Sequence, residues 1–471
     1  SGDLLDRVGG VFFNYNSANT SDALQKIAQT LSPQLSKHRD DIQLNAELFK
    51  RVKAVYDQRN QLKLTTEQLT LLEKTYKGFV RSGAALPADK QARLRKINEE
   101  SSLLTLKFGQ NILTETNGYK LVIDKKEDLS GLPSSLVAAA AEDAKKRKLE
   151  GKWVFTLQNP SIMPFLQYAD NRALREQIFK AYLERCNHND ASDNKAIMSK
   201  IVALRAEKAA LLGYENHAAY VLEESMSKTP AKVSDFLNQL WSATVPVTQQ
   251  EASELQTLMD KEGKNEKLES WDWRYYAEKL RKQKYDLDEE ELRPYFPLEG
   301  VRQGIFTLCK KLYGLTFERR TDIPVYHEEA QAFEVKEANG QHVGVIYMDF
   351  HPRASKRGGA WMTSYRKQET ENGKRSAPVV SIVCNFSRPA GDAPALLSLD
   401  ETRTFFHEFG HALHGLLSNV TYGSLSGTSV PRDFVELPSQ IMENWATEPE
   451  MLKLYAKHYK TGAVIPDVLI D

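Results

Sequence analysis

Two histidines four residues apart constrain this chain more than any other feature. Residues 407–411 read His-Glu-Phe-Gly-His, and on an α-helix His407 and His411 would lie one turn apart on the same face. A divalent metal can then take one ring nitrogen from each of them. Glu408 follows the first histidine, where its carboxylate can reach a metal-bound water without binding the metal itself. This spacing is typical of two zinc ligands plus a general base, and it predicts one Zn²⁺ per chain.

The residues around the histidine pair favour a helix. Ser398 and Glu401 form the S-x-x-E pattern of a capping box at the expected helix start. Phe406 and Leu413 are spaced to pack on one side, and no proline interrupts the segment before residue 418. Gly410 lowers helix propensity by about 1 kcal/mol relative to alanine. Its missing side chain would also let another backbone or a substrate approach closely.

A third protein ligand is needed, because catalytic zinc usually has three protein ligands and a water. The sequence offers Glu436 and His414. Glu436 comes after a Gly/Ser-rich connection, residues 422–428, which is long enough to turn the chain back toward the first helix. His414 shares the face of His407 and His411, but three ligands along one straight helix cannot surround one ion. Glu436 is therefore the favoured third ligand.

Two polar residues after Glu436 are candidates to orient the ligand rings by hydrogen bonds. Gln440 and Glu443 follow it by one and two helical turns. For both side chains the alternative is simple exposure to solvent. For the whole segment the alternative is a solvated helix with incidental histidines, since a bare HExxH pattern also arises by chance. The capping box and the acidic segment downstream favour the metal site.

These segments resemble the thimet-oligopeptidase family of zinc peptidases, family M3. The resemblance rests on residues 407–414, 426–428 and 432–436, and it extends over nearly the whole chain. It implies a mainly α, zincin-like fold with two helical lobes and a small β-sheet beside the zinc helix. The further segments that carry it are 11–20, 271–278, 322–327 and 356–362.

The resemblance also implies an activity, which is the release of C-terminal dipeptides from short, unstructured peptides by a zinc enzyme. The sequence does not give the oligomeric state, for which a monomer is favoured. Glu408 would take a proton from the attacking water and pass it to the leaving amine. Gly359 and Ala360, in a glycine-rich loop, and Gly427 are candidate contacts for the peptide. The alternative for the loop is a plain turn. An edge strand beside the site is expected to pair with the peptide backbone.

The family places oxyanion donors and residues that hold the peptide end in a segment beyond the zinc ligands. This chain ends at Asp471, so we expect it to lack that segment and to be truncated at both ends. Two alternative functions therefore stay open. One is an oligo-endopeptidase of the same family, and the other is a catalytically silent fragment that binds zinc or peptide.

Charge and hydropathy argue against other classes of protein. The chain has 63 acidic and 63 basic residues, which gives no reason to expect nucleic acid as a partner. No apolar run approaches the roughly 18 residues of a membrane helix. Cys186, Cys309 and Cys384 are too far apart to suggest a metal cluster or a disulfide framework. A cytoplasmic location is favoured, but a periplasmic or exported one stays open because the chain begins at Ser1 and not at a methionine.

Hydrophobic periodicity divides the chain into two regions. Residues 1–150 predict an N-terminal helical region, in which Ser32-Pro33 ends one helix. Residues 151–471 predict the catalytic region, C-terminally incomplete, with the zinc site in 398–447. Alternating apolar residues predict short strands at 119–123, 333–335, 343–348 and 379–384.

Overall fold

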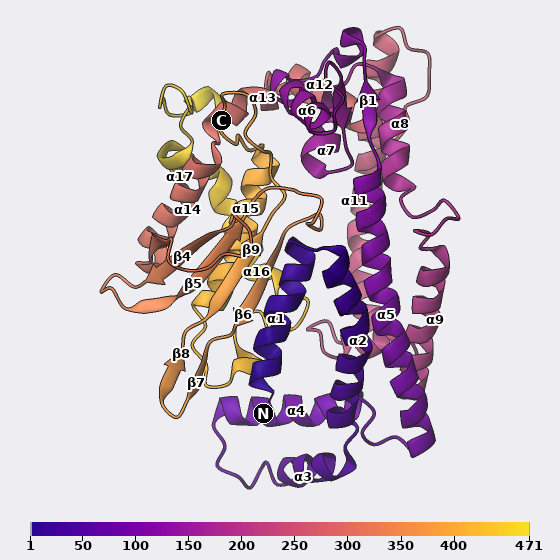
Figure 1. Cartoon of the computed structure of the whole chain (residues 1–471), viewed down its shortest axis with the longest axis vertical. Helices are drawn as coiled ribbons and strands as arrows, with labels where there is room; N and C mark the ends of the chain where they lie inside the picture. The colour runs from indigo at the N-terminus through magenta and orange to yellow at the C-terminus, as the bar shows by residue number, and fades with distance from the viewer. Residues whose placement is uncertain (1, 471) are drawn as a thin grey trace.

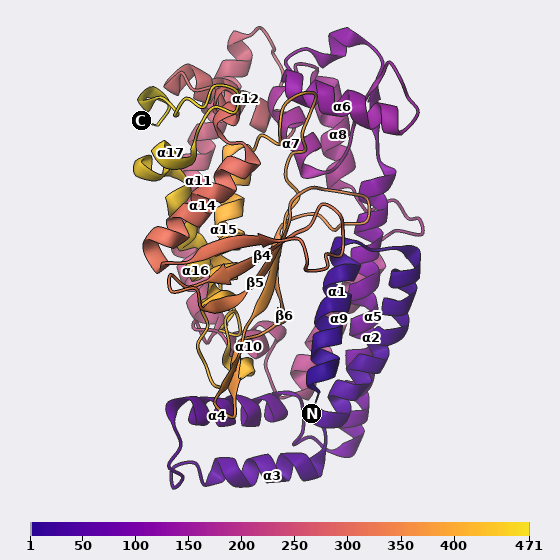
Figure 2. The same cartoon turned by 60° about the vertical axis from the view of Figure 1, so that its left-hand side comes forward.

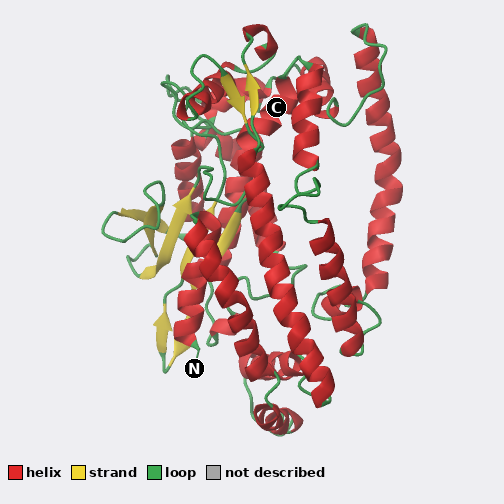
Figure 3. Cartoon of the chain, turned by 45° about the vertical axis from the view of Figure 1, so that its right-hand side comes forward, coloured by secondary structure: helices red, strands yellow, loops and turns green. Residues whose placement is uncertain are grey.

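The computed structural model describes residues 2–470 and is mainly helical, with strands confined to small sheets (Figure 3). The helices are α1 (Asp3–Ala18), α2 (Asp22–Gln43), α3 (Ala46–Asp57), α4 (Thr66–Arg81), α5 (Ala88–Gly118), α6 (Ser134–Lys146), α7 (Asn159–Tyr168), α8 (Arg172–Leu183), α9 (Lys195–Leu211), α10 (His217–Leu222), α11 (Pro230–Lys261), α12 (Trp273–Tyr285), α13 (Glu289–Leu292), α14 (Leu298–Tyr313), α15 (Leu399–Leu416), α16 (Glu436–Thr447) and α17 (Pro449–Tyr455). The strands are β1 (Leu121–Ile123), β2 (Trp153–Phe155), β3 (Thr316–Arg320), β4 (Gln331–Lys336), β5 (His342–Asp349), β6 (Trp361–Arg366), β7 (Glu369–Glu371), β8 (Lys374–Ser376) and β9 (Val379–Val383). This composition confirms the predicted mainly α fold with a small sheet.

The long helices and the main sheet lie on opposite sides of the molecule. Figure 1 shows α5, α9 and α11 on one side, with α14 to α17 and the sheet on the other. Figure 2 shows α1 and α2 beside α5, across from α14 and α17. The predicted boundary at residue 150 stays a prediction. The strands on either side of it, β1 and β2, pair antiparallel and share one small core.

One predicted helix end is wrong. Ser32-Pro33 does not end a helix, because α2 runs through Pro33 to Gln43. Contacts with α5 hold both halves of α2: Gln29 Nε2 donates to Gln110 Oε1 at 2.9 Å, and Asn98 donates to Asp40 at 2.8 Å. This packing outweighs the backbone hydrogen bond that proline cannot make.

The main sheet is mixed and has the strand order β3-β4-β5-β9-β6. Strands β3, β4 and β5 pair antiparallel, β5 pairs parallel with β9, and β9 pairs antiparallel with β6. Strand β6 is therefore an edge strand. Its side chains alternate between the faces. Trp361 donates to Asn14 of α1 at 3.0 Å, and Met362 on the other face lies against Gly415 of α15.

The helix α15 that carries the histidine pair crosses the largest hydrophobic core. Phe405, Phe406 and Phe409 are all fully buried in this core, which also contains residues of the sheet, α14, α16 and α17. Ala412, Leu413 and Leu416 belong to the same core, so packing fixes the apolar face of α15 over three consecutive turns. The polar residues 407, 408 and 411 lie on the opposite face of the same helix.

Candidate metal centre

The predicted capping box is present at the start of α15. The backbone N–H of Glu401 donates to Ser398 Oγ at 3.1 Å, and the backbone N–H of Ser398 donates to Glu401 Oε2 at 2.8 Å. These reciprocal bonds satisfy two of the amide groups that an α-helix leaves unpaired at its N-terminus. The helix thus begins where the sequence predicts, and this start sets which side chains share a face further along.

Helix α16 lies close to α15 because Gly410 has no side chain. A Cβ atom on Gly410 would lie 2.6 Å from Ser439 Cα and 2.7 Å from the carbonyl oxygen of Pro438. Any larger residue would push α16 away. The close approach that the sequence suggested for this glycine is therefore made by the backbone of α16, whose first residue is Glu436.

Three metal-binding atoms meet between the two helices. The ligand atoms of His407, His411 and Glu436 all lie within 4.8 Å of one another. Glu436 Oε2 is 3.3 Å from His407 Nε2 and 3.1 Å from His411 Nε2. Two imidazole nitrogens and one carboxylate oxygen are a donor set of catalytic zinc sites. The residues present therefore fit a divalent cation such as Zn²⁺.

Local contacts prepare these donors for a metal. Burial lowers the pKa of His411, although the charge of Glu436 acts in the opposite direction, so the ring is kept in its neutral, metal-binding form. Burial would raise the pKa of Glu436, but a hydrogen bond from Ser439 and the charge of His411 lower it. The Ser439 hydroxyl donates to Glu436 Oε2 at 2.9 Å.

The rival ligand, His414, is not part of this group. It lies on α15 with its Nδ1 atom buried and without a hydrogen-bond partner among the described residues. Glu436, from the second helix, instead brings its carboxylate to the histidine pair. The structure thus brings together the three residues that the sequence favoured as metal ligands.

The two candidates for orienting the ligand rings differ. Glu443 Oε1 lies 2.7 Å from His407 Nδ1, so it can fix the ring with Nε2 directed at the other donors. Arg403 lies 3.8 Å from the same carboxylate. Gln440 is exposed, and its side chain makes no hydrogen bond among the described residues. The geometry supports Glu443 in this role and gives Gln440 none.

Replacing Glu443 by glutamine is expected to weaken metal binding by about tenfold to a hundredfold, because a neutral amide holds the His407 ring less firmly. The measurement is competition for Zn²⁺ with a fluorescent chelator. Gln440→Ala is the matched control from the next turn of α16, and its affinity should stay at the wild-type value. Equal affinities for all three proteins would show that Glu443 does not orient the ring.

Glu408 lies next to the three donors without belonging to the group. Its side chain is buried, and its Oε2 atom has no hydrogen-bond partner among the described residues. Burial raises the pKa of Glu408 to about 7, with the charge of His407 lowering it and that of Glu436 raising it. A carboxylate with one unused oxygen beside a metal site can accept a proton from a neighbouring water.

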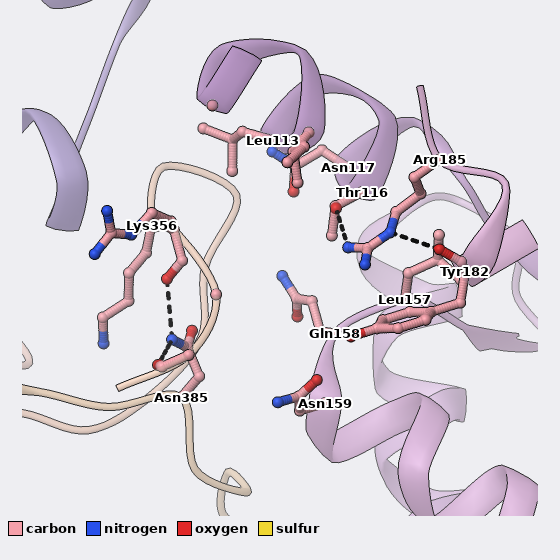
Figure 4. Close-up of a pocket in the computed structure, with 15 residues that line it drawn as sticks. Leu113, Thr116, Asn117, Leu157, Gln158, Asn159, Tyr182, Arg185, Lys356 and Asn385 are labelled. Carbon is pink, nitrogen blue, oxygen red and sulfur yellow. Dashed lines mark hydrogen bonds between the residues drawn. The ribbon is translucent and has the colours of Figure 1, made fainter. Parts of the chain in front are cut away.

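The three candidate peptide contacts lie at two places around α15. Gly427, at φ +51°, packs against the helix: a Cβ atom there would lie 3.0 Å from Gly415 Cα. Gly359, at φ +88°, faces open space, and its carbonyl oxygen accepts a hydrogen bond from Asn385 at 2.6 Å (Figure 4). Ala360 is half-buried and immediately precedes β6. Gly359 is exposed to solvent, whereas Gly427 is buried against α15, and the roles of all three residues stay predictions.

A buried charge network near this loop was not found from the sequence. Lys356 Nζ is buried and donates to Asp349 Oδ1 at 2.9 Å and to the carbonyl oxygen of Cys384 at 2.6 Å. Asp349 also accepts from Tyr326 at 2.7 Å and from Arg353 at 2.9 Å. These contacts hold the loop before β6 to the ends of β5 and β9. Spacing in the sequence gives no signal for them, since charged residues in a loop are usually exposed.

This chain is similar in sequence to known peptidases. The model of peptidase family M3 matches residues 165–471. Dipeptidyl carboxypeptidase of Escherichia coli (strain K12) is 41% identical over 470 residues, which are 100% of this chain and 69% of that protein. Oligopeptidase A of the same organism is 37% identical over 475 residues, which are 100% of this chain and 70% of that protein.

A solved structure supports the fold alone. A crystal structure described as an oligoendopeptidase F superimposes with a TM-score of 0.50 at 16% identity. The alignment covers 97% of this chain and 64% of that one, so this chain spans less than two thirds of it.

Among the described residues, no helix is both long and apolar enough to cross a membrane. The family match over residues 165–471 and the relatives aligned along the whole chain show that this protein belongs to peptidase family M3, a family of metallopeptidases.

Proposed function

We propose that this chain acts as a zinc-dependent peptidyl-dipeptidase, which releases dipeptides from the C-terminus of short, unstructured peptides. The observation that carries the proposal is the meeting of His407, His411 and Glu436 beside the buried carboxylate of Glu408. A peptidase of this kind needs a Lewis acid and a base within reach of one water. The 41% identity with a dipeptidyl carboxypeptidase supports the choice of reaction.

The metal would be held by His407, His411 and Glu436, with Glu443 fixing the His407 ring. When bound, Zn²⁺ supplies Lewis acidity that makes water a stronger nucleophile and stabilises negative charge on the peptide carbonyl oxygen. Glu408 takes the proton of the attacking water on its unused oxygen. It then passes the same proton to the nitrogen of the leaving amine, so the carboxylate is restored at the end of the cycle.

The peptide would lie along β6. This edge strand makes no backbone hydrogen bond on its outer side with another described residue, and α15 packs against one of its faces. A peptide that adds to the edge gains main-chain hydrogen bonds whatever its side chains are, which suits substrates of varied sequence. Gly359 and Ala360 would meet the peptide at the start of the strand. Gly427 would act from behind α15 by keeping the helix in place.

A second function is favoured by a specific finding, the 37% identity with oligopeptidase A. An oligo-endopeptidase would use the same metal ligands and base but would cut inside the peptide, independently of a free C-terminus. The two functions thus share their chemistry and differ in what holds the end of the substrate.

Product analysis separates the two functions. A peptidyl-dipeptidase is expected to release successive dipeptides from an N-acetylated hexapeptide, and to act on its C-terminal amide with a kcat/KM about tenfold to a hundredfold lower, because a charged contact is lost. Mass spectrometry of the products at early times is the measurement. A chelator should stop the reaction and added Zn²⁺ should restore it. Equal internal cleavage of both peptides would favour the oligo-endopeptidase instead.

A further inference from the structure

The metal ligand Glu436 begins a helix that needs an anchor outside itself. It is the first residue of α16 and follows a long loop, residues 417–435, that leads from α15. Val435, the residue before it, is apolar and cannot cap the helix with a side-chain hydrogen bond. Because an uncapped helix end frays, the backbone of Glu436 depends on contacts made by the preceding loop.

Two overlapping turns connect Glu436 to Asp433, three residues earlier. The backbone N–H of Phe434 donates to the carbonyl oxygen of Pro431 at 3.0 Å, and the N–H of Leu437 donates to that of Phe434 at 2.9 Å. Asp433 lies inside the first turn and Glu436 inside the second. A displacement of Asp433 would therefore be passed along the backbone to the metal ligand.

The carboxylate of Asp433 is bound to a distant part of the chain. Its Oδ1 accepts a hydrogen bond from the backbone N–H of Met226 at 2.8 Å, and its Oδ2 accepts one from the N–H of Ser227 at 3.0 Å. These bonds lower the pKa of Asp433, so the group is ionised at neutral pH. Since each oxygen has its own donor, the two bonds fix the orientation of the carboxylate as well as its position.

Helix α4 holds the same two segments from below. Figures 1 and 2 show α4 across the lower end of the molecule. Three of its charged residues are spaced by seven, so they share one side of the helix: Glu67, Lys74 and Arg81.

Each of these three residues contacts one of the two segments. Glu67 accepts from the backbone N–H of Thr421 at 3.0 Å, and Lys74 donates to the carbonyl oxygen of Ser429 at 3.2 Å. Arg81 pairs with Glu223, in the loop that contains Met226 and Ser227. The loop before Glu436 and the loop that binds Asp433 are thus attached to one helix.

We propose that Asp433 is a positioning residue for the metal site, and that its bonds to Met226 and Ser227 set where Glu436 meets His407 and His411. The proposal rests on the proposed function, since it concerns the metal ligands of that site. It gives the segment between α10 and α11 a part in a metal centre to which that segment contributes no ligand. All three ligands would remain without these bonds, but the carboxylate of Glu436 would no longer be held ready for the metal.

Zinc affinity of the intact chain tests this inference. Asp433→Ala is expected to weaken Zn²⁺ binding about tenfold, as measured by competition with a fluorescent chelator, because a group that orients a ligand is lost. Asp433→Asn keeps one acceptor oxygen and should recover part of the affinity. Circular dichroism and Tm of each variant show that the folded protein is being titrated. A merely structural role would lower Tm and leave the affinity of the folded protein unchanged.

Asp193→Ala is the matched control. Asp193 also accepts two backbone hydrogen bonds in a loop, from Asn189 at 2.7 Å and from Lys195 at 2.9 Å. It directly precedes the residues of α9, which lies on the other side of the molecule from α16 (Figure 1). Its loss should leave zinc affinity at the wild-type value.

A second arm separates position from charge. The titrations are repeated in 1 M salt, where the field of an exposed carboxylate is screened within about 3 Å. Loss of positioning should persist there. A difference between wild type and Asp433→Ala that disappears in salt would mean that Asp433 acts on the metal through its charge, and the inference would be wrong.

The remaining outcomes distinguish this inference from the function on which it rests. If Asp433→Ala binds Zn²⁺ as tightly as the wild type, or no more weakly than Asp193→Ala, then Asp433 does not position Glu436 and the metal site itself is untouched. If the wild type binds no Zn²⁺, the proposed function fails together with this inference.

Discussion

Replacing Glu408 by glutamine is expected to lower kcat by about 10²-fold to 10⁴-fold while the metal stays bound, because only the proton acceptor is removed. Glutamine keeps the size and shape of the side chain, so the packing of α15 should not change. Glu408 is not one of the three residues that offer a ligand atom to the metal. The measurements are turnover of a fluorogenic peptide and zinc content by elemental analysis of the same protein sample.

Glu436→Ala is the control that separates a base from a ligand. It removes one of the three donors, so zinc content and activity should fall together. The Glu408 variant should lose activity alone. Near-native turnover of Glu408→Gln would show that another group accepts the proton, and loss of zinc from it would show that Glu408 helps to hold the metal.

The metal centre could be predicted from the sequence because its information is local. Helical spacing places His407 and His411 on one face, and the reciprocal bonds of Ser398 and Glu401 fix where the helix begins. Glu436 was harder to predict, since it belongs to another helix. The glycine-rich connection indicated only that the chain could return, and Gly410 indicated only that something could approach closely. The contact of Gly410 with Ser439 is what joins these two signals.

Features that depend on distant contacts could not be predicted in this way. Pro33 looks like a helix end because proline lacks an amide hydrogen, yet packing of α2 against α5 carries the helix through it. Asp433 looks like one of many acidic residues in a loop. Only the fold shows that its carboxylate binds the backbone of Met226 and Ser227. The sequence gives residue types and local geometry, whereas these two cases are decided by neighbours far along the chain.

The same limit applies to the buried charges around Asp349. Its carboxylate is inaccessible to solvent and is shared by Tyr326, Arg353 and Lys356. Although burial alone would raise the pKa of Asp349, the hydrogen bond from Arg353 and the charge of Lys356 lower it. Burial lowers the pKa of Lys356 to about 8, against the charge of Asp349. The network connects the end of β5 to the loop that leads to Gly359 and β6.

Replacing Asp349 by leucine is expected to lower the free energy of unfolding by about 3–5 kcal/mol, because it leaves the buried ammonium group of Lys356 without its carboxylate partner. Arg353 would keep Glu329, which lies 3.6 Å away, as its remaining partner. Urea denaturation at neutral pH is the measurement. The double variant Asp349→Leu, Lys356→Met should be more stable than the single one, since it replaces both members of the pair by apolar groups.

The stability of the wild type should also depend on pH. Because the pKa of Asp349 is lowered in the folded protein, its carboxylate stabilises the wild type at pH values above its unfolded pKa of 3.8. This contribution is lost as the pH falls through the folded pKa. The stability deficit of the variant should therefore shrink in acid; a deficit that is the same at every pH would mean that lost packing, and not the lost charge, destabilises the protein.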